Sequence, residues 1–289
     1  AASGTLASLI PPSVLMIVYA VITEQSVARL LIAGLIPGIM SAAIYMIGIY
    51  FIARLYPKLC PIPDERFTLR EKISSLKGVW GIMALFTLVI GGIYLGFFVP
   101  TYAGAVGAFG AFMIVLLKGR MNSRALIETF KDAGITTSTI FIVVIGGIIF
   151  ARFLTYTGLV RDVSDWMLAM ELAPLTYLLA FAGLYLILGM LIDPIAIMVM
   201  TLPIMFPVMT SVGYDPIWLG VISIKLAEIS LITPPVGLNA YVVRSSSPVP
   251  LTLEQVFAGI TPFLVMDVLT LALLIAFPSI VTFLPNLMN

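Results

Sequence analysis

The chain has 289 residues, of which 61% are hydrophobic and 10% are charged, and its formal net charge is +1. Soluble domains are about half apolar and about a quarter charged, so the composition excludes a soluble globular protein and predicts an all-α polytopic membrane protein in a lipid bilayer. The low net charge argues against a nucleic-acid partner. The lack of histidine excludes imidazole metal sites and His-activated nucleophiles, and the single cysteine, Cys60, excludes an internal disulfide.

Apolar segments long enough to cross a bilayer, about 20 residues, recur along the chain. The first membrane-type segment, 6–22, starts almost at Ala1, with no initiator Met and no basic n-region. We therefore expect a chain that lacks N-terminal sequence and not a signal peptide. Further long spans are predicted at 30–52, 79–99, 102–117, 136–153 and 258–284, and shorter or interrupted ones at 175–192, 195–210 and 217–232.

The basic residues predict the orientation of these spans. Loops 54–77 and 118–131 carry ten of the fifteen Lys and Arg residues, and basic loops stay cytoplasmic. The turn at Pro100 and the polar stretch 158–174 then lie outside, and the C-terminus is periplasmic. Short surface helices are expected within the two basic loops, at 67–76 and 124–131, and Thr136–Thr139 are expected to mark a new helix start.

Two Pro-Pro pairs interrupt apolar segments at opposite ends of the chain. Pro11-Pro12 lies in the segment 9–19, and Pro234-Pro235 lies in the segment 231–239. An interior proline removes a helical hydrogen bond and clashes with the preceding turn, so each pair predicts a broken helix. Broken backbone at membrane depth is tolerated where it lines a cavity, whereas a kink near a helix end is the plainer alternative for either pair alone.

The two breaks resemble each other in context, which predicts an internal repeat. Each is followed by a short surface stretch and a long span that opens with Ala-Gly-x-x-Pro, at 33–37 and at 258–262. The derived orientation sends the first broken helix from inside to outside and the second from outside to inside. Inverted repeats with interrupted helices are typical of secondary transporters. The predicted organisation is 1–53, the end of the first repeat; 54–133, loops and a two-span linker; and 134–289, the second repeat.

Asp193 is the sharpest single candidate for a functional side chain. A carboxylate within a membrane segment is costly and marks function by default, and Pro194 after it marks a helix end. If 175–192 and 195–210 form a re-entrant hairpin, Asp193 lies at its tip at mid-depth. The alternative is an ordinary solvated loop between two full spans.

Oxygen-bearing and flexible residues surround both breaks and are candidates for binding an ion or a substrate. Unwound carbonyls and hydroxyls suit a hard cation, and helix N-termini suit an anionic group. The alternative is that these groups satisfy the broken backbone and nothing else. The candidates are Gly4, Thr5, Pro11, Pro12 and Ser13 at the first break and Thr233, Pro234, Pro235, Val236, Gly237 and Asn239 at the second.

Other charged residues receive weaker assignments. Lys225 and Glu228 are spaced i,i+3 and are expected to neutralise each other inside the protein, with an ion-pathway role for Glu228 as the alternative. Arg152 is expected to reach the interface or to attract an anion, and Asp267 to pack inward without a role. Gly104, Gly107 and Gly110 are expected to permit close helix packing.

Six stretches resemble the large membrane subunit, or permease, of tripartite ATP-independent periplasmic (TRAP) transporters. These stretches are 4–13, 98–103, 149–154, 191–194, 213–216 and 228–239. They occur in the order expected for that family over nearly the whole chain, and the stretch 228–239 is the most specific. The resemblance implies an elevator-type, sodium-coupled uptake of a small organic anion such as a carboxylate or sialic acid. It also implies a small membrane subunit and a soluble periplasmic binding protein as partners, and a bacterial inner-membrane location.

The resemblance also implies roles for particular residues. Each repeat of the family has a re-entrant hairpin followed by a broken helix, so Asp193-Pro194 matches the second hairpin tip and Thr233–Gly237 the second break. Sodium would be held between them, near Asp193, Thr233 and Gly237, and no other cofactor is implied. Pro11-Pro12 matches the first break, whose hairpin would precede Ala1. Tyr102 stands where the family often has Glu after Pro-Thr, so any role of that carboxylate does not carry over.

Four other classes remain as alternatives. An anion transporter without a binding protein would share the repeat. A channel or pore subunit would show polar stripes along whole helices. An intramembrane enzyme would need the missing His or a Gly-x-Gly-Asp motif, and an assembly subunit would have no need of paired breaks.

Overall fold

A computed structural model of the chain describes residues 2–57, 68, 71, 74–75, 78–119, 122–247 and 249–288. The regular structure of these residues is helical, which confirms the predicted all-α class. The chain divides into two compact units, one formed by residues 1–45 and 139–289 and the other by residues 46–138. The division falls within two helices, α4 (Leu35–Leu55) and α8 (Ser123–Tyr156).

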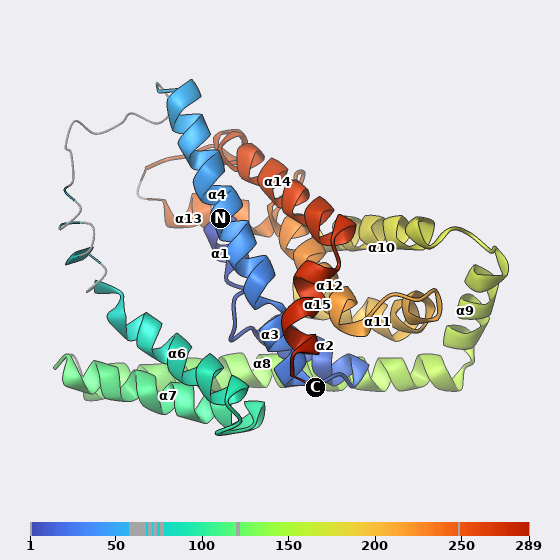
Figure 1. Cartoon of the computed structure of the whole chain (residues 1–289), viewed down its shortest axis with the longest axis horizontal. Helices are drawn as coiled ribbons and strands as arrows, with labels where there is room; N and C mark the ends of the chain where they lie inside the picture. The colour runs from blue at the N-terminus through green and yellow to red at the C-terminus, as the bar shows by residue number, and fades with distance from the viewer. Residues whose placement is uncertain are drawn as a thin grey trace. The chain divides into compact units, whose positions relative to one another are not determined.

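The larger unit contains most of the helices, including those on either side of the two Pro-Pro pairs (Figure 1). Besides the start of α4 and the end of α8, it holds α1 (Ala2–Leu6), α2 (Val14–Thr23), α3 (Val27–Ala33), α9 (Leu159–Ala169), α10 (Pro174–Gly189), α11 (Pro194–Ser211), α12 (Pro216–Ile232), α13 (Leu238–Ser246), α14 (Leu253–Ala276) and α15 (Ser279–Asn286).

Helix α12 lies at the centre of this unit. It packs against helices from both ends of the chain, namely α1, α2, α3, α10, α11, α13, α14 and α15. Its start is defined by Asp215, whose carboxylate accepts the N–H groups of Ile217 and Trp218 at 2.9 and 2.8 Å. The Trp218 indole donates to the Leu274 carbonyl of α14 at 2.9 Å. Almost every residue of α12 is buried, as expected for a helix that is surrounded by other helices.

The structure confirms both predicted broken helices. Helix α1 ends at Leu6 and α2 begins at Val14, and α12 ends at Ile232 while α13 begins at Leu238. Both Pro-Pro pairs lie in these gaps, with cis peptide bonds. Their inverted relation stays a prediction.

Helices α10 and α11 form a hairpin that packs on α12. A side-chain carbon placed on Gly189, the last residue of α10, would overlap the Ser230 side chain of α12. The hairpin end and the last turns of α12 are therefore in direct contact. Whether the hairpin is re-entrant stays a prediction.

Several predicted boundaries were wrong. The expected surface helix 124–131 and span 136–153 form one helix, α8, and no new helix starts at Thr136–Thr139. The reason is that the segment contains no proline, and Gly134 alone costs only about 1 kcal/mol.

Two other segments also differ from the prediction. The last span, 258–284, is split into α14 and α15 at Pro278, which lacks the backbone N–H for a helical hydrogen bond. The polar stretch 158–174 contains α9. The expected surface helix 67–76 lies mostly outside the described residues. Cys60 also lies outside them.

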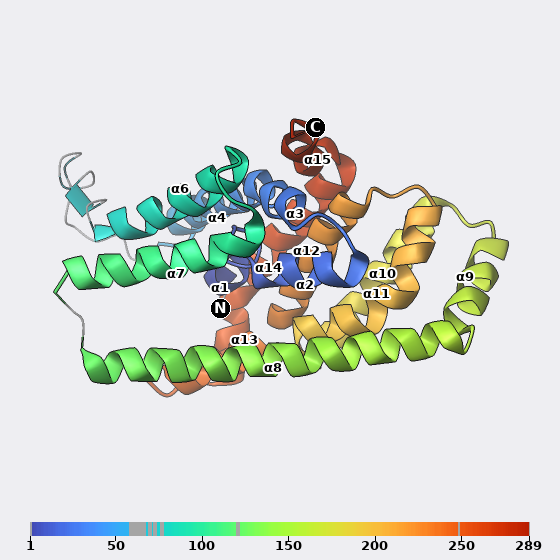
Figure 2. The same cartoon turned by 90° about the horizontal axis from the view of Figure 1, so that it is seen from below.

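The smaller unit contains the rest of α4, α6 (Trp80–Tyr94), α7 (Pro100–Leu117) and the start of α8. Helices α6 and α7 lie side by side (Figure 2). Side-chain carbons placed on Gly107 and Gly110 would lie 3.2 Å from Val89 and 2.7 Å from Leu85, whereas one on Gly104 would meet open space. The predicted packing role therefore holds for Gly107 and Gly110.

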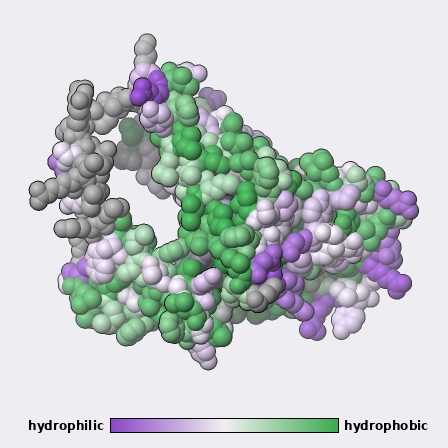
Figure 3. Space-filling model, viewed as in Figure 1, coloured by the Kyte–Doolittle hydropathy of each residue, from purple (hydrophilic) through white to green (hydrophobic). Residues whose placement is uncertain are grey.

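The surface of the protein is rich in large apolar side chains, many of them in view in Figure 3. Four helical segments are long and apolar enough to cross a membrane: Val27–Leu55, Ser123–Tyr156, Pro194–Ser211 and Leu253–Ala276. Exposed apolar surface on this scale suits lipid and not water, so the chain is a multi-pass membrane protein.

Candidate functional site

A pocket of about 410 Å³ lies where the two broken helices meet. One wall comes from the residues that precede the first Pro-Pro pair, and the other from residues on both sides of the second. The lining residues are Ser3, Gly4, Thr5, Ser8, Leu231, Asn239, Val242 and Val243. Helices α1 and α12 pack against each other, so segments more than 220 residues apart in the sequence form one site.

Thr5 is the buried polar residue of the first wall. Its hydroxyl donates to the Ala2 carbonyl at 2.7 Å, and the oxygen keeps lone pairs that can accept a hydrogen bond or bind a cation. Gly4 has no atom within 4 Å of the place where a side chain would start. The backbone at Gly4 is therefore open to a small ligand.

The other candidates of the first break lie apart from this wall. Ser13 is buried, and its hydroxyl oxygen accepts the Met16 N–H at 3.3 Å, so it caps α2. Pro11 is buried and Pro12 is exposed. Gly4 and Thr5 line the pocket, and Pro11, Pro12 and Ser13 define the break behind it.

The second break also has a threonine whose hydroxyl donates to a carbonyl of the preceding helical turn. The Thr233 hydroxyl donates to the Ile229 carbonyl at 2.6 Å, so its lone pairs are also free. Gly237 has φ of 54°, a left-handed conformation that favours glycine, and a side-chain carbon there would lie 2.8 Å from the Phe257 ring. Pro234 and Pro235 are exposed, Val236 is half-buried, and Asn239 is half-buried and lines the pocket.

Asp193 lies at the turn between α10 and α11. Its carboxylate is exposed and accepts the Ile195 N–H at 2.8 Å, which makes it the N-cap of α11. The contact between Gly189 and Ser230 brings the end of α10 to within one helical turn of Thr233. The hairpin end and the second break are thus neighbours, and the predicted ion contact of Asp193 stays a prediction.

A buried charge cluster lies in α12 and α14. The predicted pair is present, with Lys225 Nζ 3.3 Å from Glu228 Oε2, but Asp267 Oδ1 is closer to Nζ, at 2.7 Å. All three side chains are fully buried. Asp267 was expected to have no role, although an acid in the middle of one apolar helix and a Lys in the middle of another could have indicated this pair. Arg152 is exposed on α8.

Among the described residues no group of three or more His, Cys, Asp or Glu side chains is placed to hold a metal ion. A cation bound at the breaks would therefore rely on hydroxyl and carbonyl oxygens with at most one or two carboxylates.

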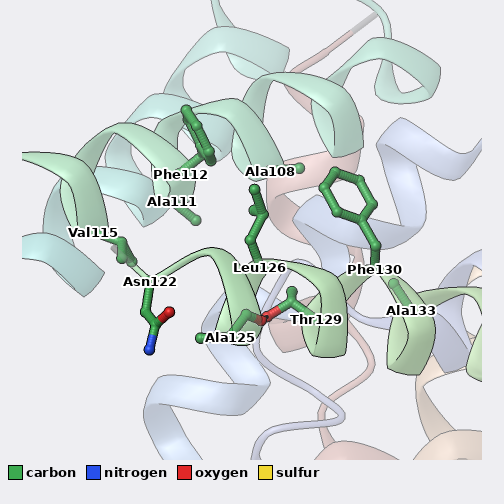
Figure 4. A pocket seen from close by; sticks show the side chains of 10 residues that line it. All are labelled: Ala108, Ala111, Phe112, Val115, Asn122, Ala125, Leu126, Thr129, Phe130 and Ala133. Carbon is green, nitrogen blue, oxygen red and sulfur yellow. Dashed lines mark hydrogen bonds between the residues drawn. The ribbon is translucent and has the colours of Figure 1, made fainter. Parts of the chain in front are cut away.

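A second pocket, of about 370 Å³, lies between α7 and the start of α8 (Figure 4). Its lining is mainly apolar, with Asn122 and Thr129 as the polar side chains: Ala108, Ala111, Phe112, Val115, Asn122, Ala125, Leu126, Thr129, Phe130 and Ala133. It offers little to orient a polar ligand, so the pocket at the breaks is the better candidate.

Comparison with known proteins agrees with this picture. Residues 1–280 match the family described as "Tripartite ATP-independent periplasmic transporter, DctM component". The chain is 36% identical over 98% of its length to the C4-dicarboxylate TRAP transporter large permease protein DctM of Pseudomonas aeruginosa, covering 66% of that protein.

Relatives with other named substrates match almost equally well. The chain is 32% identical to the sialic acid TRAP transporter large permease protein SiaM of Vibrio cholerae and 31% identical to the ectoine/5-hydroxyectoine TRAP transporter large permease protein UehC of Ruegeria pomeroyi. Each match covers 99% of this chain and 66% of the relative. The chain thus spans about two thirds of the length of these relatives. It belongs to the DctM family, the large permease subunits of TRAP transporters, a family of transport proteins and not an enzyme class.

Proposed function

We propose that the protein carries out sodium-coupled uptake of a small organic anion, bound in the pocket where the two broken helices meet. The relatives are named for C4-dicarboxylates, sialic acid and ectoine compounds, of which the first two are organic acids. A pocket of about 410 Å³ is of the size that encloses small molecules. The observation that carries the proposal is that this pocket joins both breaks.

The anion would be held by neutral donors. Backbone N–H groups around Gly4, hydroxyls of Ser3 and Ser8, and the Asn239 amide are the donors that line the pocket or lie in its wall. Hydrogen bonds to a charged acceptor are stronger than those between neutral groups. An array of neutral donors binds a carboxylate and still releases it, which a carrier needs.

Sodium would bind beside the second break, between the Asp193 turn and Thr233–Gly237. The Thr233 hydroxyl donates its proton to Ile229 and so offers only lone pairs to an incoming ion. Breaks in helices free carbonyl oxygens for the same purpose. Ordering of the hairpin end against α12 by the ion, through the contact at Gly189 and Ser230, would couple ion binding to the shape of the pocket.

We extend the proposal to the transport mechanism and the partners that the family implies. The protein would move its substrate by an elevator-type motion in the bacterial inner membrane, with loops 54–77 and 118–131 in the cytoplasm and the C-terminus in the periplasm. A small membrane subunit would complete the permease, and a soluble periplasmic binding protein would deliver the anion.

The test uses two matched Asp-Pro helix starts. Asp193 and Asp215 both precede proline and both accept N–H groups of the following helix. Asn keeps such a cap at little cost, so Asp193→Asn and Asp215→Asn remove a charge and leave the helix start intact. Uptake would be measured in vesicles that contain the complete permease and its binding protein, with and without a sodium gradient.

We expect Asp193→Asn to lower sodium-driven uptake by about tenfold or more, the effect of losing about 1.4 kcal/mol of ion binding, and Asp215→Asn to stay near the wild type. Equal uptake by the two variants would remove Asp193 from the ion site. Uptake by the wild type that needs no sodium would refute the coupling itself.

A further inference from the structure

The buried cluster of Lys225, Glu228 and Asp267 has more negative than positive charge. Two carboxylates face one ammonium, and all three side chains have no exposed surface. An ionised cluster would hold one uncompensated negative charge inside the protein, which is strongly unfavourable. A second positive charge, or one proton, is needed to balance it.

The three residues are not equivalent. Asp267 Oδ1 lies 2.7 Å from Lys225 Nζ, the length of a charge-assisted hydrogen bond. Glu228 Oε2 lies 3.3 Å away, beyond the usual range for such a bond. The ammonium is therefore paired with Asp267, and Glu228 is the carboxyl left over.

Oxygen atoms of both acids lack partners. Among the described residues, Glu228 Oε1 and Asp267 Oδ2 make no hydrogen bond, and neither does the hydroxyl of Tyr45. The Tyr45 side chain is 6% exposed, and its hydroxyl lies beside Asp267 and within electrostatic reach of Glu228. A buried, unpaired hydroxyl thus faces the unpaired carboxyl oxygens, an arrangement that a proton shared among them would satisfy.

In the described part of the chain, no other charged group is placed to neutralise the cluster. Arg29 of α3 hydrogen-bonds Asn286 of α15, and Arg244 of α13 is exposed. The neighbouring tyrosines of α2 and α10 face other groups, since Tyr19 donates to Pro216 and Tyr185 lies by Thr201 and Ser223. The titratable groups that face Glu228 are Lys225 of its own helix, Asp267 of α14 and Tyr45 of α4.

We propose that this cluster is a proton-binding site, in which Glu228 is protonated at neutral pH while Lys225 and Asp267 form an ion pair. A proton fits where a metal ion does not, because the Lys225 ammonium already lies between the two carboxylates and would repel a second cation. The site is separate from the anion pocket but adjoins it. The Tyr45 hydroxyl lies beside Thr5, and Thr5 lines the pocket, so these two hydroxyls lie between the cluster and the pocket.

Infrared spectroscopy of the full-length protein in detergent tests this directly. A protonated carboxyl has a C=O stretching band that a carboxylate lacks. We expect the wild type at pH 7 to show this band, Glu228→Gln to lose it, and Glu254→Gln, which changes an exposed acid of α14, to keep it. Absence of the band from the wild type, or its persistence in Glu228→Gln, would overturn the proposal.

Thermal melting provides a second readout that does not depend on transport. An unfolded glutamate is ionised at neutral pH, so the folded protein would hold one more proton than the unfolded chain, and its stability must fall as the pH rises. We expect the melting temperature of the wild type to fall from pH 7 to pH 9 by several degrees more than that of Glu228→Gln. Equal pH dependence of the two proteins would count against the proton.

The two acids also give different expected stabilities. Gln has the shape of a protonated Glu, so Glu228→Gln should melt near the wild type at pH 7, whereas Asp267→Asn removes the close partner of Lys225 and should melt well below it. If Glu228→Gln were the less stable variant, Glu228 would not be the proton carrier. Because neither readout involves sodium or uptake, failure here is distinguishable from failure of the proposed transport function.

Discussion

The contact between Gly189 and Ser230 gives a quantitative prediction for the join between the α10–α11 hairpin and α12. In Gly189→Ala the new methyl group would overlap the Ser230 side chain. Overpacking of this kind costs about 1–3 kcal/mol. The Ser230 hydroxyl also donates to the Ala227 carbonyl at 2.6 Å, and displacing it would lose about 1 kcal/mol more.

The same helix supplies a matched control. A side-chain carbon at Gly183 would meet nothing within 4 Å, so Gly183→Ala should gain about 0.5–1 kcal/mol from reduced backbone freedom alone. Because the same gain applies to Gly189→Ala in that helix, the two alanine variants should differ by the clash alone, about 2–4 kcal/mol. At about 2–4 °C per kcal/mol for chains of this size, the expected gap in melting temperature is roughly 10 °C.

The assay is thermal melting of the purified full-length protein in one detergent at one scan rate, since membrane proteins commonly unfold irreversibly. Ser230→Gly removes the clashing atoms and should recover most of the loss in the Gly189→Ala background. Equal melting of Gly189→Ala and Gly183→Ala would show that the hairpin end does not pack on α12 as described.

Two further variants test the neighbouring contacts. Gly237→Ala should destabilise the protein by about 1–3 kcal/mol, because φ is 54° there and the methyl group would meet Phe257. Adding Phe257→Ala should relieve the clash but not the backbone strain, so it should restore only part of the melting temperature. A full rescue would contradict the left-handed conformation of Gly237. Trp218→Phe should lower the free energy of unfolding by about 1–3 kcal/mol, because the Leu274 carbonyl loses its indole donor in a buried site. The control is Trp80→Phe, at an exposed tryptophan of α6. Equal melting of the two variants would exclude that hydrogen bond as a link between α12 and α14.

The sequence predicted the helical class and both breaks, because proline acts locally. Two consecutive prolines, as at Pro11-Pro12 and Pro234-Pro235, remove two successive backbone donors, and their positions could be read directly, whereas single prolines such as Pro203 and Pro207 lie inside α11. Sequence similarity in turn predicted the family. The start of α8 was harder, since hydroxyl-rich residues such as Thr136–Thr139 are compatible with both a helix start and a helix interior.

The site was predictable only in part. Thr5 and Asn239 were candidates, but that they line one pocket depends on the packing of α1 against α12, which no local pattern specifies. The pairing of Lys225 with Asp267 was missed for the same reason. The i,i+3 spacing indicated Glu228 as the partner, whereas the closer partner comes from another helix.

That pairing has a consequence for how the protein is made. Lys225 lies near the middle of α12, and a charged residue at the centre of a helix opposes insertion by about 2.5–3.5 kcal/mol. The counterion of Lys225 is synthesised 42 residues later. Helix α12 is therefore poorly suited to enter the bilayer when it first leaves the ribosome, and we expect it to wait beside the insertion machinery until α14 has been translated, so that the two helices leave for the lipid together.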